Sequence, residues 1–397
     1  MATATYKCPN CDSGLTFDPA SQEFNCDYCH SHFTLQEMEH IHQSTAQSHL
    51  AQEGQQPTPP PEQARWAPPP EAEGQPGAAA AGQTAQAQSQ AQTQAGAGQA
   101  AEPGQIMLYS CPSCGAEIAT DATTAATYCY YCHNPVVLLG QLEGQYRPNK
   151  LIPFSVDRPS AVNAFLKWAK TRWFVPKGFF SEKQVEKITG VYFPYWLVDS
   201  DLKAETRGTA TRVRVWQVGE TEFTETQYFN IARGGNIHFE DISKNALRKE
   251  NSKLCDGVHP YRDEGIVDFT PAYLSGFQAE RRNVEAAEYQ SEVSRDIENF
   301  SQRLLRDTVQ GYATVSLPAP TITGCRLNWD YTLLPVWTLT YKGKDGKTYF
   351  YTMNGQTGKV TGILPLNRGK LLLTFGLIAL GVGVALALIF GLGGIML

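Results

Sequence analysis

The sequence predicts a multidomain protein with two small four-cysteine modules, an α+β domain with a largely antiparallel sheet, and one C-terminal transmembrane helix. Three observations predict this class: a cysteine pattern that occurs twice, an aromatic-rich stretch with strand-like runs and amphipathic helices, and a long uncharged run at the C-terminal end. With 397 residues, the chain exceeds one ordinary domain. We expect a first module at 1–42, a linker at 43–105, a second module at 106–142, the α+β domain at 143–366 and the helix at 371–397.

The first and second modules are copies of one pattern. The segment from Tyr6 to His30 realigns on the segment from Tyr109 to His133 at a constant offset of 103 residues and without a gap. Each copy holds two CxxC pairs separated by 14 residues, a spacing that lets a hairpin bring four thiolates to one tetrahedral site. The predicted metal ligands are Cys8, Cys11, Cys26, Cys29, Cys111, Cys114, Cys129 and Cys132.

We interpret these cysteines as two structural zinc sites. Four cysteine ligands leave no open position for water or substrate, and a module of about 30 residues is too small to fold on a hydrophobic core alone. Disulfides are the first alternative, but a reducing cytosol does not maintain them. The CxxCH motifs at Cys26–His30 and Cys129–His133 also match c-type haem attachment, which would leave the first CxxC of each module without a role.

The C-terminal run from Leu371 to Leu397 carries no charge over 27 residues. At about 1.5 Å per helical residue, it exceeds the roughly 30 Å of bilayer hydrocarbon. The N-terminus shows no signal-peptide pattern, and Arg368 and Lys370 lie at the near end of the run. We therefore expect a single-pass, tail-anchored protein in contact with the lipid of the cytoplasmic (inner) membrane, with its N-terminus in the cytoplasm.

Small residues recur every four positions within this run, at Ala379, Gly383, Ala387 and Gly391. On a helix they form one smooth ridge along which another membrane helix can approach closely. The ridge predicts transmembrane packing, either as a homo-oligomer or with a partner's helix.

The linker at 43–105 consists largely of Gln, Ala, Pro and Gly, with almost no large apolar side chains. Such a segment buries too little surface to offset its ordering entropy, so we expect it to be disordered.

The α+β domain is expected to contain two amphipathic helices. One runs from a cap at Asp157 or Ser160 to about Arg172, with an apolar face of Val162, Phe165, Leu166, Ala169 and Trp173. The other spans Asn283 to Val309, with Val293, Ile297, Phe300, Leu304 and Thr308 on one face. The predicted strands are Ile188–Val198, Thr209–Val218, Glu222–Ile231, Tyr312–Leu317, Leu333–Tyr341, Thr348–Met353 and Lys359–Leu364, with a tight turn at Asn354-Gly355.

The first of these helices also carries basic and aromatic residues that suit a membrane surface. They are Lys167, Lys170 and Arg172, with Lys177 beyond them, beside Trp168 and Trp173. Basic residues and tryptophans at the headgroup level favour binding to an anionic leaflet. The alternative is that Trp173 and the apolar face pack on the domain's own sheet.

The charge distribution argues against nucleic-acid binding. The whole chain has a net charge of −6, and the residues before Gly144 hold two basic against fourteen acidic side chains. The second module has no Lys or Arg from Ile106 to Gly140. Nucleic-acid affinity depends on basic side chains that neutralise phosphates. We therefore expect protein partners, not DNA or RNA.

Enzyme motifs are not found in the α+β domain. The GQTGKV segment at 355–360 resembles the end of a phosphate loop, but Met353 stands where the first glycine is required and Val360 replaces the Ser/Thr. The sequence has no GxSxG and no HExxH. We expect no enzyme, and the alternative is a ligand sensor or an uncharacterised enzyme housed in residues 143–366, which would need a cleft with converging polar groups.

The chain resembles bacterial membrane-anchored proteins with transcription-factor-IIB-type zinc ribbons. The resemblance rests on the paired ribbons, on PYWLVDSDL at 194–202, on LLPVWTLTYKGKDGKTYFYTMNGQTGKVTGILP at 333–365 and on the terminal span. Members of that group lie beside phage-shock-protein-A-like and flotillin-like (SPFH) proteins, which implies recruitment at a stressed membrane. The resulting expectation is a membrane-tethered adaptor whose acidic ribbons, on a flexible arm, recruit or scaffold cytosolic or membrane-stress proteins.

Overall fold

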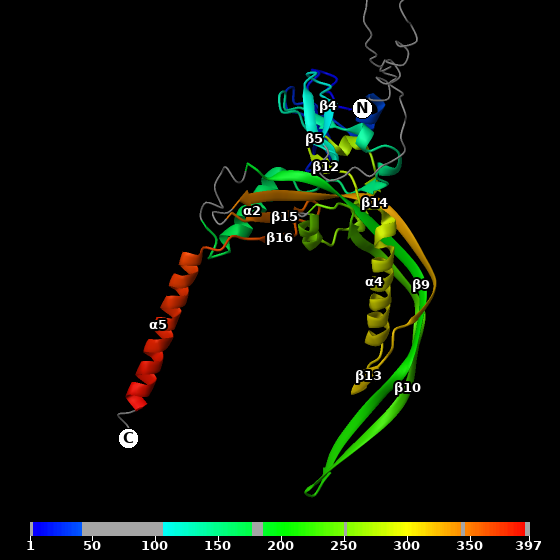
Figure 1. Ribbon diagram of the computed structural model, residues 1–397, viewed down its shortest axis with the longest axis vertical. Helices are drawn as coiled ribbons and strands as arrows, with labels where there is room; N and C mark the ends of the chain where they lie inside the picture. The colour runs from blue at the N-terminus through cyan, green and yellow to red at the C-terminus, as the bar shows by residue number, and fades with distance from the viewer. Residues whose placement is uncertain (1–2, 42–105, 177–185, 250–251, 343–345, 394–397) are drawn as a thin grey trace, which may run out of the picture. The chain divides into compact units, whose positions relative to one another are not determined.

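The computed structural model describes residues 3–41, 106–176, 186–249, 252–342 and 346–393 (Figure 1). The chain divides into one unit of Met1–Met38 with Ala101–Leu397 and a second unit of Glu39–Ala100. The predicted linker at 43–105 and nearly all of the second unit lie outside the described residues. Every sheet of the described residues belongs to the first unit.

The described residues form an eleven-stranded sheet and two smaller sheets, as the fold class predicted. The longest path through the large sheet runs β11-β8-β14-β9-β12-β6-β7, while β10 and β13 pair with β9, and β15 joins β14 to β16. All of its pairs are antiparallel except β12 with β9 and β14 with β8. Its strands are β6 (Thr124–Tyr128), β7 (Pro135–Val137), β8 (Lys150–Leu151), β9 (Thr189–Val218), β10 (Thr221–Asn245), β11 (Val267–Asp268), β12 (Gln278–Glu280), β13 (Thr314–Ser316), β14 (Thr321–Lys342), β15 (Thr348–Asn354) and β16 (Val360–Ile363).

The smaller sheets belong to the cysteine modules. The first contains β1 (Leu15–Asp18), β2 (Glu23–Cys26) and β3 (His32–Phe33), and the other contains β4 (Ile106–Ser110) and β5 (Glu117–Asp121). Short 3-10 helices connect the elements of the large domain: η1 (Leu139–Gln141), η2 (Gly144–Tyr146), η4 (Ser252–Val258), η5 (Asp263–Gly265) and η6 (Pro271–Leu274).

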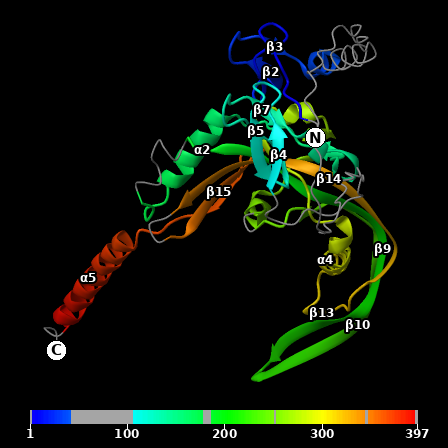
Figure 2. The same cartoon turned by 45° about the horizontal axis from the view of Figure 1, so that its top comes forward.

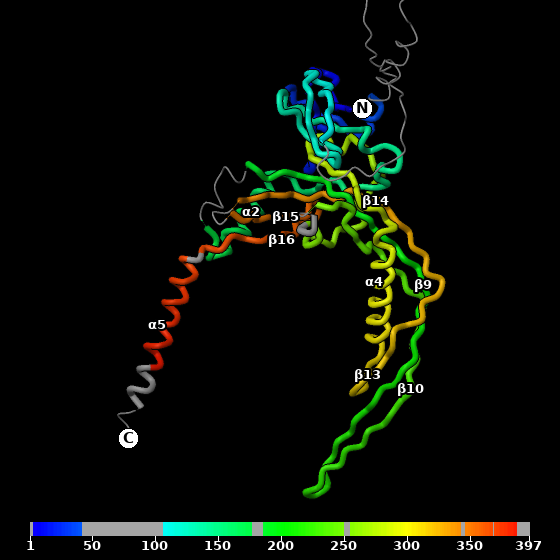
Figure 3. The backbone as a smooth tube through the Cα atoms, in the orientation of Figure 1, coloured from blue at the N-terminus to red at the C-terminus, as the bar shows by residue number. Residues whose placement is uncertain are grey.

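Strands β9 and β10 are much longer than the sequence predicted. The expected strands Ile188–Val198 and Thr209–Val218 are two parts of β9, because the polar stretch between them stays extended. In that stretch Leu202 and Ala204 are buried while their neighbours are exposed, which is the alternation of a strand with one covered face. The β9–β10 pair continues as a two-stranded ribbon past β13 (Figure 3).

Helix α4 (Ala286–Asp307) covers one face of this strand pair (Figure 1). A capping box between Glu285 and Glu288 begins it. The predicted apolar face is correct at Val293 and Ile297 but wrong at Phe300 and Leu304, which are 39% and 49% exposed. The buried row advances by four residues at each step, so Ser301 and Leu305 face the sheet in their place.

Helix α2 (Arg158–Lys170) begins as predicted, because the Asp157 side chain accepts a hydrogen bond from the Ser160 N–H at 3.1 Å. Phe165 and Ala169 are buried, and Phe165 packs edge-on against Tyr351 at 4.9 Å between ring centroids. The prediction that Trp173 belongs to the apolar face is wrong: this side chain is 83% exposed. It lies beyond the end of α2, where the helical periodicity no longer places it.

The turn at Asn354-Gly355 is not the two-residue hairpin that the sequence suggested. Met353 pairs with Val360, so six residues lie between these two partners, and the positive φ falls on Gly358. The Asn354 side chain accepts hydrogen bonds from the N–H groups of Gln356 and Thr357, which stabilises the longer loop. Gly355 is needed because a Cβ atom there would lie 2.6 Å from the Phe154 ring.

Helix α5 (Arg368–Gly393) coincides with the predicted membrane run. Its segment Gly369–Leu386 is long and apolar enough to cross a membrane, and none of it is buried against the rest of the protein. The end of the predicted run, 394–397, lies outside the described residues.

Candidate metal centres

Each CxxC pair folds into a tight knuckle closed by backbone hydrogen bonds. In the first knuckle the Asp12 N–H donates to the Cys8 carbonyl at 2.9 Å, and the Cys8 N–H donates to the Ser13 carbonyl at 2.7 Å. The other three knuckles repeat both bonds at equivalent positions. The four residues that follow the knuckles all adopt positive φ: Asp12, His30, Gly115 and His133, at 63°, 57°, 74° and 58°.

This shared conformation explains the histidine of the two CxxCH motifs. His30 and His133 occupy the same left-handed position as Asp12 and Gly115, so the structure uses these residues to close a turn. Sequence reasoning missed this role. The available signal was the residue after the second cysteine of each pair, since Asp, Gly and His tolerate positive φ better than β-branched residues do.

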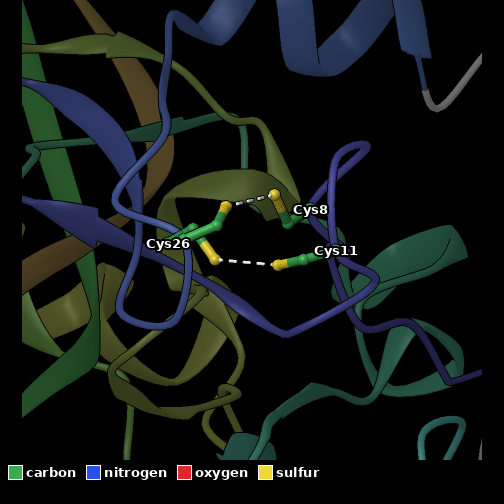
Figure 4. Close-up of side chains that lie close together, drawn as sticks. Cys8, Cys11 and Cys26 are labelled. Atoms are coloured by element: carbon green, nitrogen blue, oxygen red, sulfur yellow. Dashed lines mark hydrogen bonds between the residues drawn. The ribbon is translucent and has the colours of Figure 1, made fainter.

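The knuckles bring four sulfur atoms together in each module. The Sγ atoms of Cys11 and Cys26 lie 3.4 Å apart and those of Cys8 and Cys29 lie 3.5 Å apart (Figure 4). The corresponding pairs of the second module, Cys111 with Cys132 and Cys114 with Cys129, are both 3.7 Å apart. All four sulfur atoms of each group lie within 4.8 Å of one another. The eight predicted ligands are therefore assembled as two groups of four.

These groups can each hold one metal ion. Four thiolates at about 2.3 Å from a tetrahedral centre are separated by about 3.8 Å, close to the distances found here. The ten cysteines of the chain are thiols in the structure, so the clusters contain no disulfide. The Ser31 hydroxyl, 3.2 Å from the Cys29 sulfur, is the main group that lowers the pKa of this thiol to about 6. Burial raises the pKa of the Cys8 thiol in the same group, so the first thiolate forms at Cys29, and a bound metal would displace the protons of the remaining thiols.

The first module packs against the large domain and does not form a separate arm. The Phe17 N–H donates to the Ser275 carbonyl at 3.0 Å, and the Ser275 hydroxyl donates to the Leu15 carbonyl. The Gln22 amide donates to the Phe154 carbonyl at 2.8 Å. The expectation of ribbons on a flexible arm is therefore wrong for the described residues, because β1 and the turn after η6 share buried hydrogen bonds.

The second module is continuous with the large sheet. Cys129 and Cys132 lie between β6 and β7, and Ala126 of β6 pairs with Ala279 of β12. The first module joins this arrangement through Ala4, whose N–H and carbonyl exchange two hydrogen bonds of 2.8 Å with Val137. Figure 2 shows β2 and β3 of the first module beside β4, β5 and β7. The two four-cysteine groups thus lie in one folded unit.

The second knuckle of each module presents tyrosine to solvent. Tyr28 and Tyr131 are 78% and 73% exposed, and they occupy equivalent positions of the repeat; Tyr130 beside Tyr131 is 66% exposed. Each knuckle lies in an acidic module, as the sequence showed. Exposed aromatic rings are enriched where proteins bind other proteins.

A cavity of about 660 Å³ lies between the first module and the large domain. Its polar groups are largely engaged: the Tyr128 hydroxyl donates to the Gly276 carbonyl, the Arg158 guanidinium donates to two backbone carbonyls, and Asp157 caps α2. A ligand sensor, the alternative function, would need a cavity of this kind.

The two cysteines outside the modules differ from each other. Cys255 is a small buried side chain that is 1% exposed, whereas Cys325 is exposed. Burial raises the pKa of the Cys255 thiol, so this thiol stays protonated. Burial also lowers the pKa of nearby His259 to about 4. A protonated thiol is a weak nucleophile, and an imidazole of such low pKa is a weak base.

The residues predicted for transmembrane packing lie on α5. Ala379 and Gly383 are exposed on this helix, and a Cβ atom at Gly383 would meet nothing within 4 Å. The side chains at 387 and 391 lie outside the described part of the chain. Packing along the ridge remains a prediction.

A relative in a bacterium decides the family. The chain is 30% identical over 333 residues to uncharacterized protein YdjG of Bacillus subtilis (strain 168), and the match covers 72% of this chain and 97% of YdjG. The chain belongs to the YdjG family. No protein-family model and no solved structure matches it. The similarity to YdjG shows that the two proteins share a common ancestor. The function proposed below rests on the geometry of this chain.

Proposed function

We propose that the protein is a membrane-tethered adaptor whose two zinc ribbons bind a cytosolic or membrane-stress protein at the inner face of the membrane. The observation that carries the proposal is the repeated surface of the second knuckles, where Tyr28 and Tyr131 project from acidic modules at equivalent positions. A module that served only to close a metal site would have no need of exposed aromatic rings at both copies.

Zinc is the metal that best fits the two cysteine groups. Tetrahedral sites with four sulfur ligands are typical of structural zinc, and iron is the main competitor for them. A closed set of four ligands leaves the ion no position for substrate, so its role in this proposal is to hold the knuckles. The chemistry of recognition then falls to the side chains around the metal.

The fixed position of the modules supports recognition by a preformed surface. Hydrogen bonds from Ser275 to the first module and from Ala4 to Val137 hold both knuckles in place before any partner arrives. A preorganised surface loses less conformational entropy on binding than a mobile arm. Helix α5 would tether this surface to the bilayer, and the basic Arg368 and Lys370 favour the cytoplasmic side for the modules.

The partner class follows from charge and from the family resemblance. The carboxylates and exposed tyrosines of the modules suit a partner protein that has a basic or amphipathic surface. Opposite charges raise the association rate of the two proteins, and the aromatic rings supply apolar area that becomes buried in the complex. Phage-shock-protein-A-like and SPFH proteins are the candidates that the resemblance implies. Nucleic acid is not expected, since the modules carry a single basic residue, Lys7, between them.

The test is chemical crosslinking and affinity purification of the full chain from membranes. Tyr28→Ala combined with Tyr131→Ala should lower recovery of the crosslinked partner at least tenfold, which requires a loss of only about 0.7 kcal/mol of binding free energy from each of the two tyrosines. Phe223→Ala, an exposed aromatic change outside the modules, is the matched control and should leave recovery unchanged. Equal recovery from all three proteins would contradict the proposal.

The cavity between the first module and the large domain favours a second candidate, a ligand sensor housed mainly in residues 143–366 with the first module as one wall of its site. A ligand that fills this cavity would stabilise the folded protein in proportion to its concentration. Thermal unfolding with a library of small metabolites separates the two candidates. A saturable rise in melting temperature that Phe277→Ala abolishes would favour the sensor, since Phe277 lines the cavity.

A further inference from the structure

The outer edge of β10 is an unpaired strand edge. Within the described residues β10 pairs with β9 along its length and with no other strand, whereas β9 uses its other edge for β13 and β14. Helix α4 lies on a face of the strand pair and leaves this edge open. An open edge presents a row of backbone N–H and carbonyl groups that can accept another strand.

The register of the hairpin shows which backbone groups point outward. Val218 pairs with Thr221 across a two-residue turn in which Gly219 has a φ of 63°. Such a turn joins its flanking residues by hydrogen bonds, and bonded and non-bonded pairs alternate along an antiparallel ladder. Odd-numbered residues of β10 near the turn therefore bond to β9, and even-numbered residues from Glu222 to Ala232 direct their N–H and carbonyl groups outward.

The middle of this edge lacks the features that usually protect one. Natural edge strands carry charged residues, prolines or bulges that prevent pairing with another chain. The seven residues Thr226–Ala232 contain no charge, no proline and no glycine, and Tyr228 within them is 80% exposed. The bulge of β10 occurs later, between Phe239 and Ile242. This segment is therefore suited to strand pairing.

We propose that β10 pairs with β10 of a second copy of this chain, antiparallel and about a two-fold axis at Phe229. In this register Glu225 of each copy lies opposite Arg233 of the other, on the same face of the sheet. Within one copy, Glu225 accepts a hydrogen bond from Gln227, and the Arg233 guanidinium donates only to the adjacent Ala232 carbonyl among the described residues. Pairing would thus create two new cross-strand ion pairs.

Neighbouring registers lack this complementarity. A slip of two residues in either direction places Glu225 opposite Ile231 or Gly235 in place of Arg233. In the proposed register Gly235 lies opposite Phe223 of the second copy, where a glycine leaves room for an aromatic ring. Tyr228 lies opposite Asn230, and both of these residues direct their backbone groups outward, so the hydrogen-bonding pattern is satisfied. The sequence of the edge is therefore complementary to itself in one alignment.

The test uses disulfide formation between full-length chains in membranes. Opposed residues at a non-hydrogen-bonded position have Cα atoms about 4.5 Å apart, within reach of a disulfide. In a Cys325→Ser background, Phe229→Cys should give a disulfide-linked dimer. Thr224→Cys is the matched control: it should give none, since residue 224 would lie opposite residue 234 and far from its own copy.

Charge reversal then tests the register. Adding Glu225→Arg to Phe229→Cys should lower the disulfide-linked fraction about tenfold, because two attractive pairs become repulsive. Adding Arg233→Glu as well should restore the fraction, and metal content should stay constant throughout. No disulfide at Phe229, an equal disulfide at Thr224, or loss without restoration by the double reversal would overturn the proposal. The experiment does not depend on the ribbons, so it can fail or succeed independently of the adaptor function.

Discussion

The backbone N–H of Asn367 donates a hydrogen bond of 2.6 Å to the carbonyl of Phe174. This bond joins the segment that follows α2 to the residue that caps α5, since the Asn367 side chain accepts a hydrogen bond from the Lys370 N–H at 3.1 Å. Trp173, the neighbour of Phe174, is therefore held near the start of the apolar helix with 83% of its surface exposed. Tryptophan is enriched at the level where a membrane helix leaves the hydrocarbon.

This relationship predicts that Trp173 lies at the lipid interface. In vesicles that contain brominated lipids, bromine quenches tryptophans in contact with the acyl chains. Trp173→Phe in the full chain should remove most of the quenchable fluorescence, whereas Trp216→Phe in the β9–β10 hairpin should remove little. Unchanged quenching in the Trp173 variant would show that this side chain is not in contact with lipid.

The first cysteine group should lose its metal when one ligand is replaced. Cys26→Ser leaves three thiolates and an incomplete site, so metal analysis should fall from two zinc ions per chain to one. Hydrogen exchange should accelerate in residues 3–33 and also in residues 273–277, because Ser275 bonds to the first module. The second module should keep its protection, and exchange that accelerated equally in both modules would contradict this account.

The contact between Ser275 and Leu15 should stabilise the position of the first module. Ser275→Ala leaves the buried Leu15 carbonyl without this donor, at a cost of about 1–3 kcal/mol. Protease cleavage within residues 3–33 should therefore become several-fold faster while both metals remain bound. A module that is independent of the domain would show the same cleavage rate in the variant and in the wild-type chain.

The small-residue ridge of α5 predicts association of the transmembrane helix. Gly383→Ile with Ala387→Ile places bulky side chains on that ridge and should reduce helix association in a membrane two-hybrid assay by at least half. Leu380→Ile, an apolar change off the ridge, is the control. Equal signals from both variants would show that the ridge does not mediate packing.

The sequence predicted the cysteine centres well because their chemistry is local. Two CxxC pairs at a fixed spacing determine four ligands whatever the rest of the fold does, and all eight cysteines assemble as predicted. The position of the modules could not be predicted, because it depends on the contact of Leu15 with Ser275, which are 260 residues apart. A single sequence contains no signal for such a pair.

The length of the strands was missed for a related reason. The stretch between Val198 and Thr209 is polar enough to suggest a loop, yet it stays extended because β10 and β14 pair with it from both sides. Pairing between distant strands overrode the local preference. Trp173 was placed on the wrong surface because the periodicity was extended past the point where α2 ends.

The most direct test of the adaptor account is photocrosslinking from the knuckles in living cells. A benzophenone amino acid is placed in the full chain at Tyr28, at Tyr131 or, as the control, at Phe223. Both knuckle positions should crosslink to the same protein, Cys26→Ser should abolish the adduct at Tyr28, and the Phe223 position should not give this adduct. Adducts that are absent at both knuckles, or that persist unchanged without the metal ligand, would contradict the adaptor account.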